Sequence, residues 1–209
     1  MGKGFSVIIP TLWLPCFFEE TLVSLNDNIF VDEVIIIANA KTPKLPMLNK
    51  VHVIQQDNNI GVNPAWNLGV KLALSNNIML LNDDLQVSQE IFPCLLDLIT
   101  NDEVGIVGID PLSKDLGYPT TNIIEERPDG YGCLMVFKSK NYSTIPEGLD
   151  IYFGDDWLLF TSKKKGLLNL RISGFKTNGV LSMTSRNFTN VVYRELARYT
   201  QVTQEYDNN

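Results

Sequence analysis

Short apolar runs recur along the first third of the chain. Four of them consist almost wholly of aliphatic and β-branched residues, at positions 5–10, 34–38, 51–54 and 78–81. Continuous apolar runs of this length are typical of strands that are covered on both faces. Each run therefore predicts a strand buried inside a sheet.

Segments with helical spacing separate these runs. Residues 17–25 place apolar side chains on one helical stripe. A second helix is predicted to begin at Asn63, an N-cap residue followed by Pro64 at the first helical position, and to end near Ser75. The order strand, helix, strand, strand, helix, strand implies parallel pairing with right-handed crossovers, and hence a Rossmann-like α/β half over residues 1–81.

The pattern is less regular after residue 87. It predicts a helix that begins near residue 88 and strands at residues 104–107 and 132–137. Two further helices are predicted at residues 157–165 and 190–199. Residues 110–130 are rich in Pro, Gly, Thr and charge, so we interpret them as one long loop, which in a compact domain is usually functional. Residues 205–209 are expected to fray.

Composition limits the class of protein. The chain has 209 residues, of which 44% are hydrophobic, enough for one compact domain over residues 1–209. Its formal charge of −7 argues against a nucleic-acid-binding protein, because binding to phosphates depends on clustered Lys and Arg. No apolar run reaches the roughly 20 residues of a membrane helix, so we expect a soluble, cytoplasmic protein. Its three cysteines are expected to be reduced and buried.

Acidic residues follow the fourth predicted strand directly. Residues 80–84 read Leu-Leu-Asn-Asp-Asp, and the apolar pattern resumes at Leu85. A buried strand delivers such carboxylates to the carboxyl edge of the sheet, where open α/β sheets bind ligands. Adjacent carboxylates repel, and a hard divalent cation with oxygen ligands relieves that repulsion. The alternative is a polar turn that simply ends the strand, since Asn and Asp are common in turns.

A second acidic pair stands before the helix predicted at residues 157–165. Residues 152–157 read Tyr-Phe-Gly-Asp-Asp-Trp. A carboxylate of this pair can accept the proton of an attacking hydroxyl if it lies within hydrogen-bond reach. The alternative is that Asp155 or Asp156 only caps the backbone N–H groups of the helix.

In combination these segments resemble glycosyltransferases of the GT-A type, and among them the inverting enzymes of family 2. Residues 5–11 are similar to the opening strand of that family, and residues 59–69 to its Asn-x-Gly and Ala-x-Asn-x-Gly segment. Residues 81–84 look like its metal-binding Asp-x-Asp position, and residues 154–158 like its Glu-Asp motif. The resemblance covers residues 5–166. It implies an α/β GT-A fold with a Rossmann-like, mostly parallel central sheet flanked by helices and a small antiparallel acceptor-side portion.

The resemblance also implies an activity. A sugar would move from a nucleoside diphosphate, UDP by family frequency, to an acceptor hydroxyl on a glycan or glycoconjugate. Residues 1–87 would form the half that binds the nucleotide sugar, and residues 88–209 the acceptor-side half. Asp84 would bind Mn²⁺ or Mg²⁺ with help from Asn82, and Asp156 would act as general base, with Asp155 as the neighbouring alternative. This function requires Asp84 and Asp156 to face a common cavity.

Further roles follow residue by residue from the resemblance. Trp157 stands next to the expected base and would there contact the donor or acceptor sugar; the alternative is that this tryptophan belongs to the core. The nucleotide pocket would be lined or supported by Pro10, Thr11, Leu12, Trp13, Asn39, Asp57, Asn59, Gly61, Asn67, Asn82 and Asp83.

The chain departs from the family pattern near its C-terminal end. Many relatives have a histidine there as a metal or phosphate ligand, but residues 179–185 contain none, so Lys176 or Arg186 is expected to help hold the diphosphate. The missing histidine motivates one alternative, a catalytically inactive domain that binds nucleotide sugars.

Two further interpretations rest on other features. A sugar nucleotidyltransferase is disfavoured, because residues 11–15 contain no Gly-rich basic phosphate loop. The small size and the lack of a membrane segment resemble soluble glycosyltransferase domains of large DNA viruses, which would place the protein in the host cytoplasm.

Overall fold

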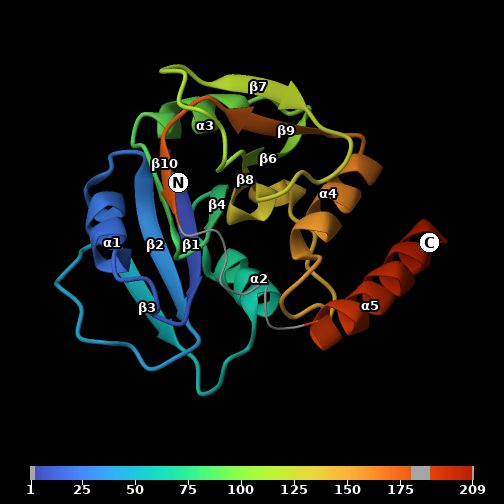
Figure 1. The fold of residues 1–209 in the computed structure, drawn as a ribbon, viewed down its shortest axis with the longest axis horizontal. Helices are drawn as coiled ribbons and strands as arrows, with labels where there is room; N and C mark the ends of the chain where they lie inside the picture. Colours follow the sequence, from blue (N-terminus) through green and yellow to red (C-terminus); the bar gives the residue numbers. More distant parts are fainter. Residues whose placement is uncertain (1–2, 180–188, 209) are drawn as a thin grey trace.

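The computed structural model describes residues 3–179 and 189–208. Within these ranges, eight strands form one sheet in the order β3-β2-β1-β4-β8-β6-β9-β7 (Figure 1). Their bounds are β1 (Phe5–Thr11), β2 (Val31–Ala38), β3 (Val51–Gln55), β4 (Asn77–Leu81), β6 (Val104–Ile109), β7 (Thr120–Ile123), β8 (Leu134–Lys138) and β9 (Leu168–Ser173). A separate two-stranded ribbon pairs β5 (Leu85–Val87) with β10 (Thr177–Gly179).

Helices cover both faces of the sheet. They are α1 (Phe18–Asp27), α2 (Val62–Leu72), α3 (Ile91–Leu98), α4 (Gly154–Lys164) and α5 (Thr189–Asp207), with short 3₁₀ turns η1 (Tyr131–Cys133) and η2 (Ser139–Asn141). One buried cluster joins the sheet to α1 and α3, and a second joins it to α2, α4 and α5. Alternate residues of β1 serve the two clusters, Val7 and Ile9 the first and Ile8 the second. This explains the unbroken apolar sequence of the strand.

Strand direction changes halfway across the sheet. β3, β2, β1 and β4 are parallel, as the order of elements predicts for a Rossmann-like half. β8 then pairs antiparallel with both β4 and β6, and β7 closes the edge antiparallel to β9. The predicted fold class is confirmed: a mostly parallel first half, flanked by helices, with a smaller antiparallel portion.

The start of α2 differs from the prediction. The helix begins at Val62 after Gly61, whose φ of 88° lies in the left-handed region that glycine tolerates. Asn63 is therefore not the N-cap, and its buried side chain donates instead to the backbone carbonyls of Leu149 and Tyr152. The helix ends at Leu72, three residues earlier than expected, because Ala73 is extended.

Other predicted bounds also need correction. The segment 110–130 is not one continuous loop, because it contains β7, an edge strand whose last three residues are exposed and whose sequence shows no alternation of apolar and polar residues. β9 and β10 were not predicted, α3 begins at Ile91 after β5, and α5 continues to Asp207, into the segment expected to fray. Cys16 is exposed rather than buried. In the part of the chain that the structure describes, no helix has the length and apolar character needed to cross a bilayer.

Close packing of α2 on β1 depends on a glycine. A Cβ added at Gly69 would lie 2.3 Å from Cγ2 of Ile8, a fully buried core side chain. Helix propensity alone favours alanine over glycine by up to about 1 kcal/mol. The overlap opposes this gain, because a packed core resists added volume.

We therefore expect Gly69→Ala to lower the free energy of unfolding by about 1–3 kcal/mol. Urea denaturation followed by circular dichroism measures this. Lys71→Ala, at an exposed position of the same helix, is the control and is expected to change stability by less than about 0.5 kcal/mol. A stabilised Gly69→Ala variant would show that β1 and α2 separate easily.

Candidate active site

A cavity of about 200 Å³ lies at the carboxyl ends of β1 and β2, beside the start of α2 and the acidic loop after β4. We call it the sheet-edge cavity. Parallel strands bring their carboxyl ends to one edge, so residues distant in sequence meet there. It is lined by Pro10, Thr11, Leu12, Leu14, Pro15, Asn39, Asn59, Gly61, Val62, Asp83, Asp84 and Ile151. Most of the predicted nucleotide-pocket residues are in this set, and Leu14, Pro15, Val62 and Ile151 are additions to it.

The acidic loop is bonded to the end of β1. Thr11 Oγ1 donates to Asp83 Oδ2 at 2.6 Å, and accepts from the backbone N–H of Trp13 at 2.8 Å. Burial raises the pKa of Asp83 despite the hydrogen bond from Thr11. Burial, together with the charge of Asp83, raises the pKa of Asp84 to about 6. Negative charge is thus disfavoured on this loop, and a cation would stabilise it.

The donor set fits a hard divalent cation. Asp83 and Asp84 offer adjacent carboxylates, and Asn82 offers an amide oxygen, the ligand types preferred by Mg²⁺ and Mn²⁺. Among residues 3–179 and 189–208, no group of three or more His, Cys, Asp or Glu side chains is placed to hold a metal. The protein would therefore supply only part of the coordination shell, and substrate phosphates and water the rest.

Asn39, on the opposite side of the sheet-edge cavity, bonds the backbone of the turn before α2. Its Nδ2 donates to the carbonyl of Gly61 and its Oδ1 accepts from the N–H of Ile60, both at 3.1 Å. Asn59 Oδ1 accepts from the N–H of Gly61 at 2.9 Å, which tightens the same turn. These bonds set the approach of α2 to the cavity, and they engage one donor and one acceptor of the Asn39 amide.

Several predicted pocket residues do not line this cavity. Trp13 packs against Phe18 with ring centroids 5.4 Å apart, and Asp57 is exposed to solvent. Asn82 is half-buried next to the cavity, and its backbone N–H donates to the carbonyl of Cys133 at 2.9 Å.

Two more predicted contacts have structural roles instead. The Asn67 side chain accepts from the Tyr142 hydroxyl and bonds the backbone of Ile145 through both its oxygen and its nitrogen. Trp157 is buried in the core, and its Nε1 donates to the carbonyl of Thr144 at 3.0 Å. The expectation that Trp157 touches a sugar is therefore wrong.

The second acidic pair lies in the first turn of α4 rather than before the helix. The N-cap position belongs to Phe153, but Asp155 Oδ1 accepts from the backbone N–H of Asp156 at 3.1 Å, so this carboxylate satisfies one N–H group of the first turn, as the capping alternative predicts. Arg127 contacts both acids: its Nε lies 3.0 Å from Asp156 Oδ1 and its NH1 3.5 Å from Asp155 Oδ2. Burial raises the pKa of Asp155 to about 6, and the Arg127 guanidinium opposes that shift.

A short segment before β8 lies next to both acidic motifs. A Cβ added at Gly132 would lie 2.6 Å from Asp155 Oδ2, so only glycine permits this approach. The following residue, Cys133, accepts from the backbone of Asn82, and its pKa is raised to about 12 by burial and by the charges of Asp84 and Asp155. Residues 132–133 thus connect the acidic loop with the base of α4.

The two motifs nevertheless line separate cavities. Asp156 faces a cavity of about 450 Å³, which we call the helix-side cavity, and Asp84 faces the sheet-edge cavity. The helix-side cavity is lined by Glu125, Glu126, Arg127, Asp156, Leu159, Phe160, Lys163 and Tyr199. Asp84 and Asp156 thus face different cavities among the described residues, and residues 132–133 contact both motifs; that the two carboxylates also share one cavity stays a prediction.

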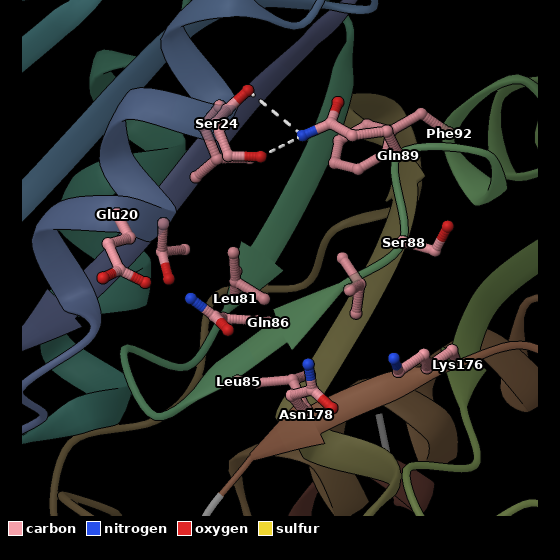
Figure 2. A pocket seen from close by; sticks show the side chains of 13 residues that line it. Glu20, Ser24, Leu81, Leu85, Gln86, Ser88, Gln89, Phe92, Lys176 and Asn178 are labelled. Carbon is pink, nitrogen blue, oxygen red and sulfur yellow. Dashed lines mark hydrogen bonds between the residues drawn. The ribbon is translucent and has the colours of Figure 1, made fainter.

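A third cavity, of about 420 Å³, lies between α1 and the β5–β10 ribbon (Figure 2). Glu20 and Ser24 of α1 stand on one side, Lys176 and Asn178 on the other, and Gln86 between them (Figure 2). Gln89 closes one end by donating to Ser24. Lys176 thus belongs to this cavity and does not line the one that contains Asp84. Arg186, the other expected diphosphate contact, lies outside the described residues.

The sequence analysis did not predict the roles that Arg127 and Asn63 have at the site. Arg127 lies in a segment interpreted only as a loop, and nothing in the local sequence marks it as a partner of Asp155 and Asp156. Asn63 was interpreted as a helix cap, although its long-range bonds join α2 to the segment before α4. Contacts across such sequence distances leave no local pattern.

The fold has the architecture of the GT-A class of glycosyltransferases: a half-parallel sheet flanked by helices, with a cavity and paired carboxylates at the carboxyl edge of its strands. The family described as "Glycosyl transferase family 2" matches residues 6–161, which is more than half of the chain. The protein therefore belongs to glycosyl transferase family 2. A comparison with curated proteins finds no significant match.

Solved structures share the fold at low sequence identity. S. aureus TarS 1-349 in complex with UDP has a TM-score of 0.64 at 16% identity, covering 91% of this chain and 64% of TarS. GalNAc-T7 with UDP, GalNAc and Mn²⁺ has a TM-score of 0.70 at 12% identity, covering 96% of this chain and 47% of that one. The chain thus spans less than two thirds of the length of either structure.

The raised pKa of Asp84 predicts an unusual effect of pH on stability. The folded state binds its proton more tightly than the unfolded chain, so this carboxylate costs stability as pH rises from about 4 to 6, and the cost is complete above pH 6. We expect Asp84→Asn to raise the free energy of unfolding at pH 7, without divalent metal, by about 1 kcal/mol, a value discounted for partial exposure.

Urea denaturation at pH 3.5, 5 and 7 measures this, and the gain is expected to vanish at the lowest pH. The exposed Asp57 provides the control, because Asp57→Asn removes a carboxylate that is in contact with water. A gain that is equal at all three pH values would contradict the proposed origin of the effect.

Proposed function

We propose that the protein is a metal-assisted, inverting glycosyltransferase that moves a hexosyl or deoxyhexosyl group from a UDP-sugar to an acceptor hydroxyl on a glycan or glycoconjugate. One observation carries the proposal. Thr11, Asn39, Gly61 and Asp84 line a single cavity at the sheet edge, and residues 132–133 connect its acidic loop with the acid pair of α4. Both of the similar solved structures, TarS and GalNAc-T7, contain UDP, which supports the choice of nucleotide.

On the donor side, the sheet-edge cavity would hold the nucleotide. Pro10, Leu12 and Ile151 offer apolar contacts, and Asn59 and the Asn39–Gly61 turn offer polar ones. Asp84, with Asp83 and Asn82, would hold Mn²⁺ or Mg²⁺, which when bound neutralises the charge of the diphosphate. Thr11 orients Asp83 through a 2.6 Å hydrogen bond, so the acidic loop is positioned before a ligand arrives.

At the reaction centre, Asp156 would accept the proton of the acceptor hydroxyl. Arg127 bonds Oδ1 of this carboxylate, and no described residue donates to Oδ2. Oδ2 is thus available to the hydroxyl. The acceptor oxygen forms its bond to the anomeric carbon as the bond from that carbon to the diphosphate breaks, with inversion. The proton goes to Asp156, and the bonding electron pair leaves with the nucleoside diphosphate.

The acceptor would enter from the helix-side cavity. At about 450 Å³ it has the size of common ligand sites, and it combines two aromatic side chains, Phe160 and Tyr199, with charged groups of both signs. Aromatic surfaces together with hydrogen-bonding groups suit a saccharide, which has apolar faces and many hydroxyls. Transfer would then require the donor sugar to extend from one cavity toward the other.

The proposal predicts turnover of a nucleotide sugar in the absence of a natural acceptor. Incubation with a panel of UDP-sugars and Mn²⁺ is expected to release UDP slowly by transfer to water, and EDTA is expected to stop it. Coupled detection of UDP measures the rate. If no common donor is bound or hydrolysed, the proposal fails. Binding without turnover would instead support an inactive domain, and release of pyrophosphate from a nucleoside triphosphate and a sugar phosphate would support a nucleotidyltransferase.

A pair of matched variants tests the assignment of the base. Asp156→Asn is expected to lower kcat by about 10²–10⁴-fold, because the hydroxyl loses its proton acceptor. The KM for the donor is expected to change little, since Asp156 does not line the sheet-edge cavity. Asp155→Asn makes the same change one residue away and is expected to have a smaller effect. A larger loss in Asp155→Asn would assign the base to Asp155.

A further inference from the structure

A short segment joins the two halves of the proposed site. We call residues 149–153 the connector, because Ile151 lines the sheet-edge cavity and α4, with Asp155 and Asp156 in its first turn, begins directly after it. Any shift of this segment would change the distance between the nucleotide and the base. The contacts that fix the connector therefore bear on catalysis as well as on stability.

The start of α2 holds the connector from one side. The carbonyl of Asp150 accepts from the backbone N–H groups of Val62 at 2.8 Å and Asn63 at 3.1 Å. The Asn63 side chain returns two bonds, to the carbonyl of Leu149 at 3.1 Å and to that of Tyr152 at 2.9 Å. The connector thus supplies carbonyl groups to α2, and the N–H groups of Ile151 and Tyr152 bond to a different helix.

Glu195 of α5 satisfies those two N–H groups. Its Oε2 accepts from Ile151 at 3.1 Å and from Tyr152 at 2.7 Å, and the residue is fully buried. Its other oxygen, Oε1, accepts from Arg194, which also contacts the carboxylate of Asp150 at 3.1 Å. Buried acidic side chains are rare unless they are paired. This carboxylate is paired with Arg194 and with two backbone N–H groups of the connector.

One helical turn later, α5 supports the last residue of the connector. Phe153 has a φ of 60°, a left-handed conformation that is strained for an aromatic residue, and its ring stacks on Tyr199 at 5.4 Å. Further along the helix, Tyr206 packs against Trp157 and Phe160 of α4. α5 therefore contacts both the connector and the helix that bears the acid pair, beside which it lies in Figure 1.

We propose that Glu195 is a positioning residue for glycosyl transfer: its carboxylate fixes the connector, and through it the position of the base of α4 relative to the sheet-edge cavity. The inference rests on the proposed function only in its effect on rate. A carboxylate suits the task because a single oxygen accepts both N–H bonds at once. Its charge strengthens both of these hydrogen bonds, because the carboxylate is fully buried.

Hydrogen exchange tests the structural part without any assay of activity. In Glu195→Ala the amides of Ile151 and Tyr152 are expected to exchange about 10–100-fold faster, the loss typical of a hydrogen bond to a charged group. Glu195→Gln keeps one acceptor oxygen, so the exchange rates of both amides in this variant are expected to lie between those of Glu195→Ala and those of the parent. Glu205→Gln, at an exposed position of the same helix, is the control and is expected to leave both amides unchanged.

Kinetics test the functional part at a temperature where circular dichroism shows each variant to be folded. The kcat of Glu195→Ala is expected to fall at least about tenfold and that of Glu195→Gln less, while the affinity for UDP alone changes by less than about threefold. If Glu195→Ala does not fold, the kcat and UDP affinity of Glu195→Gln are compared with those of Glu205→Gln, and a lower kcat in Glu195→Gln alone supports the inference.

Three results would overturn the inference, and one separates it from the proposed function. Unchanged exchange would mean that Glu195 does not hold the connector. Faster exchange with unchanged kcat would mean that Glu195 has only a structural role. A loss of UDP affinity equal to the loss of kcat would mean the same. An inactive parent protein would contradict the proposed function and leave the exchange result to be judged by itself.

Discussion

The site depends on where β4 delivers its carboxylates. The strand is buried along its whole length, so the chain that leaves it has Asp83 and Asp84 in a setting where burial already disfavours their charge. Water screens them poorly, and among residues 3–179 and 189–208 no lysine or arginine lines the sheet-edge cavity that they face. Such a loop is stabilised by a bound cation more than an exposed pair would be, because the attraction is stronger where the dielectric constant is low. The free energy of folding and the binding of a cation are therefore coupled in the acidic loop.

The same physics operates differently in the second acidic pair. Asp155 and Asp156 have a cation within the protein, the guanidinium of Arg127, and it reaches both carboxylates from a segment outside α4. One acidic motif is thus partly compensated by a cation of the protein, and the other is not. The proposed tasks differ accordingly: the pair on α4 keeps an acceptor oxygen for a hydroxyl, and the pair after β4 would attract a metal ion.

The sequence was most informative where burial is complete. The strands β1, β2 and β4 have continuous apolar runs because helices cover both faces of the sheet, and their parallel order followed from the elements between them. The apolar pattern does not predict the short strands at the periphery. β7, at the edge of the sheet, has three exposed residues of four, and β10, in the separate ribbon, is three residues long. Their pairing is decided by distant partners, which no local pattern reveals.

For the site, motif residues that follow strand ends were placed well, because parallel strands bring those ends together. Thr11, Asn39 and Asp84 line one cavity as expected. Asn67 and Trp157 were misplaced because their helices turn these side chains toward the core, where they satisfy backbone groups. Arg127 and Glu195 were not recognised, since each acts on residues far along the chain.

The β5–β10 ribbon has a consequence for biosynthesis. β5 directly follows the acidic loop, yet its partner β10 belongs to a much later stretch of the chain. The Rossmann-like half can complete its parallel strands while the ribosome is still adding residues. Its acidic loop gains its last neighbouring strand only after residues 177–179 have emerged. The nascent chain can therefore pair its first four strands well before the ribbon forms beside the acidic loop.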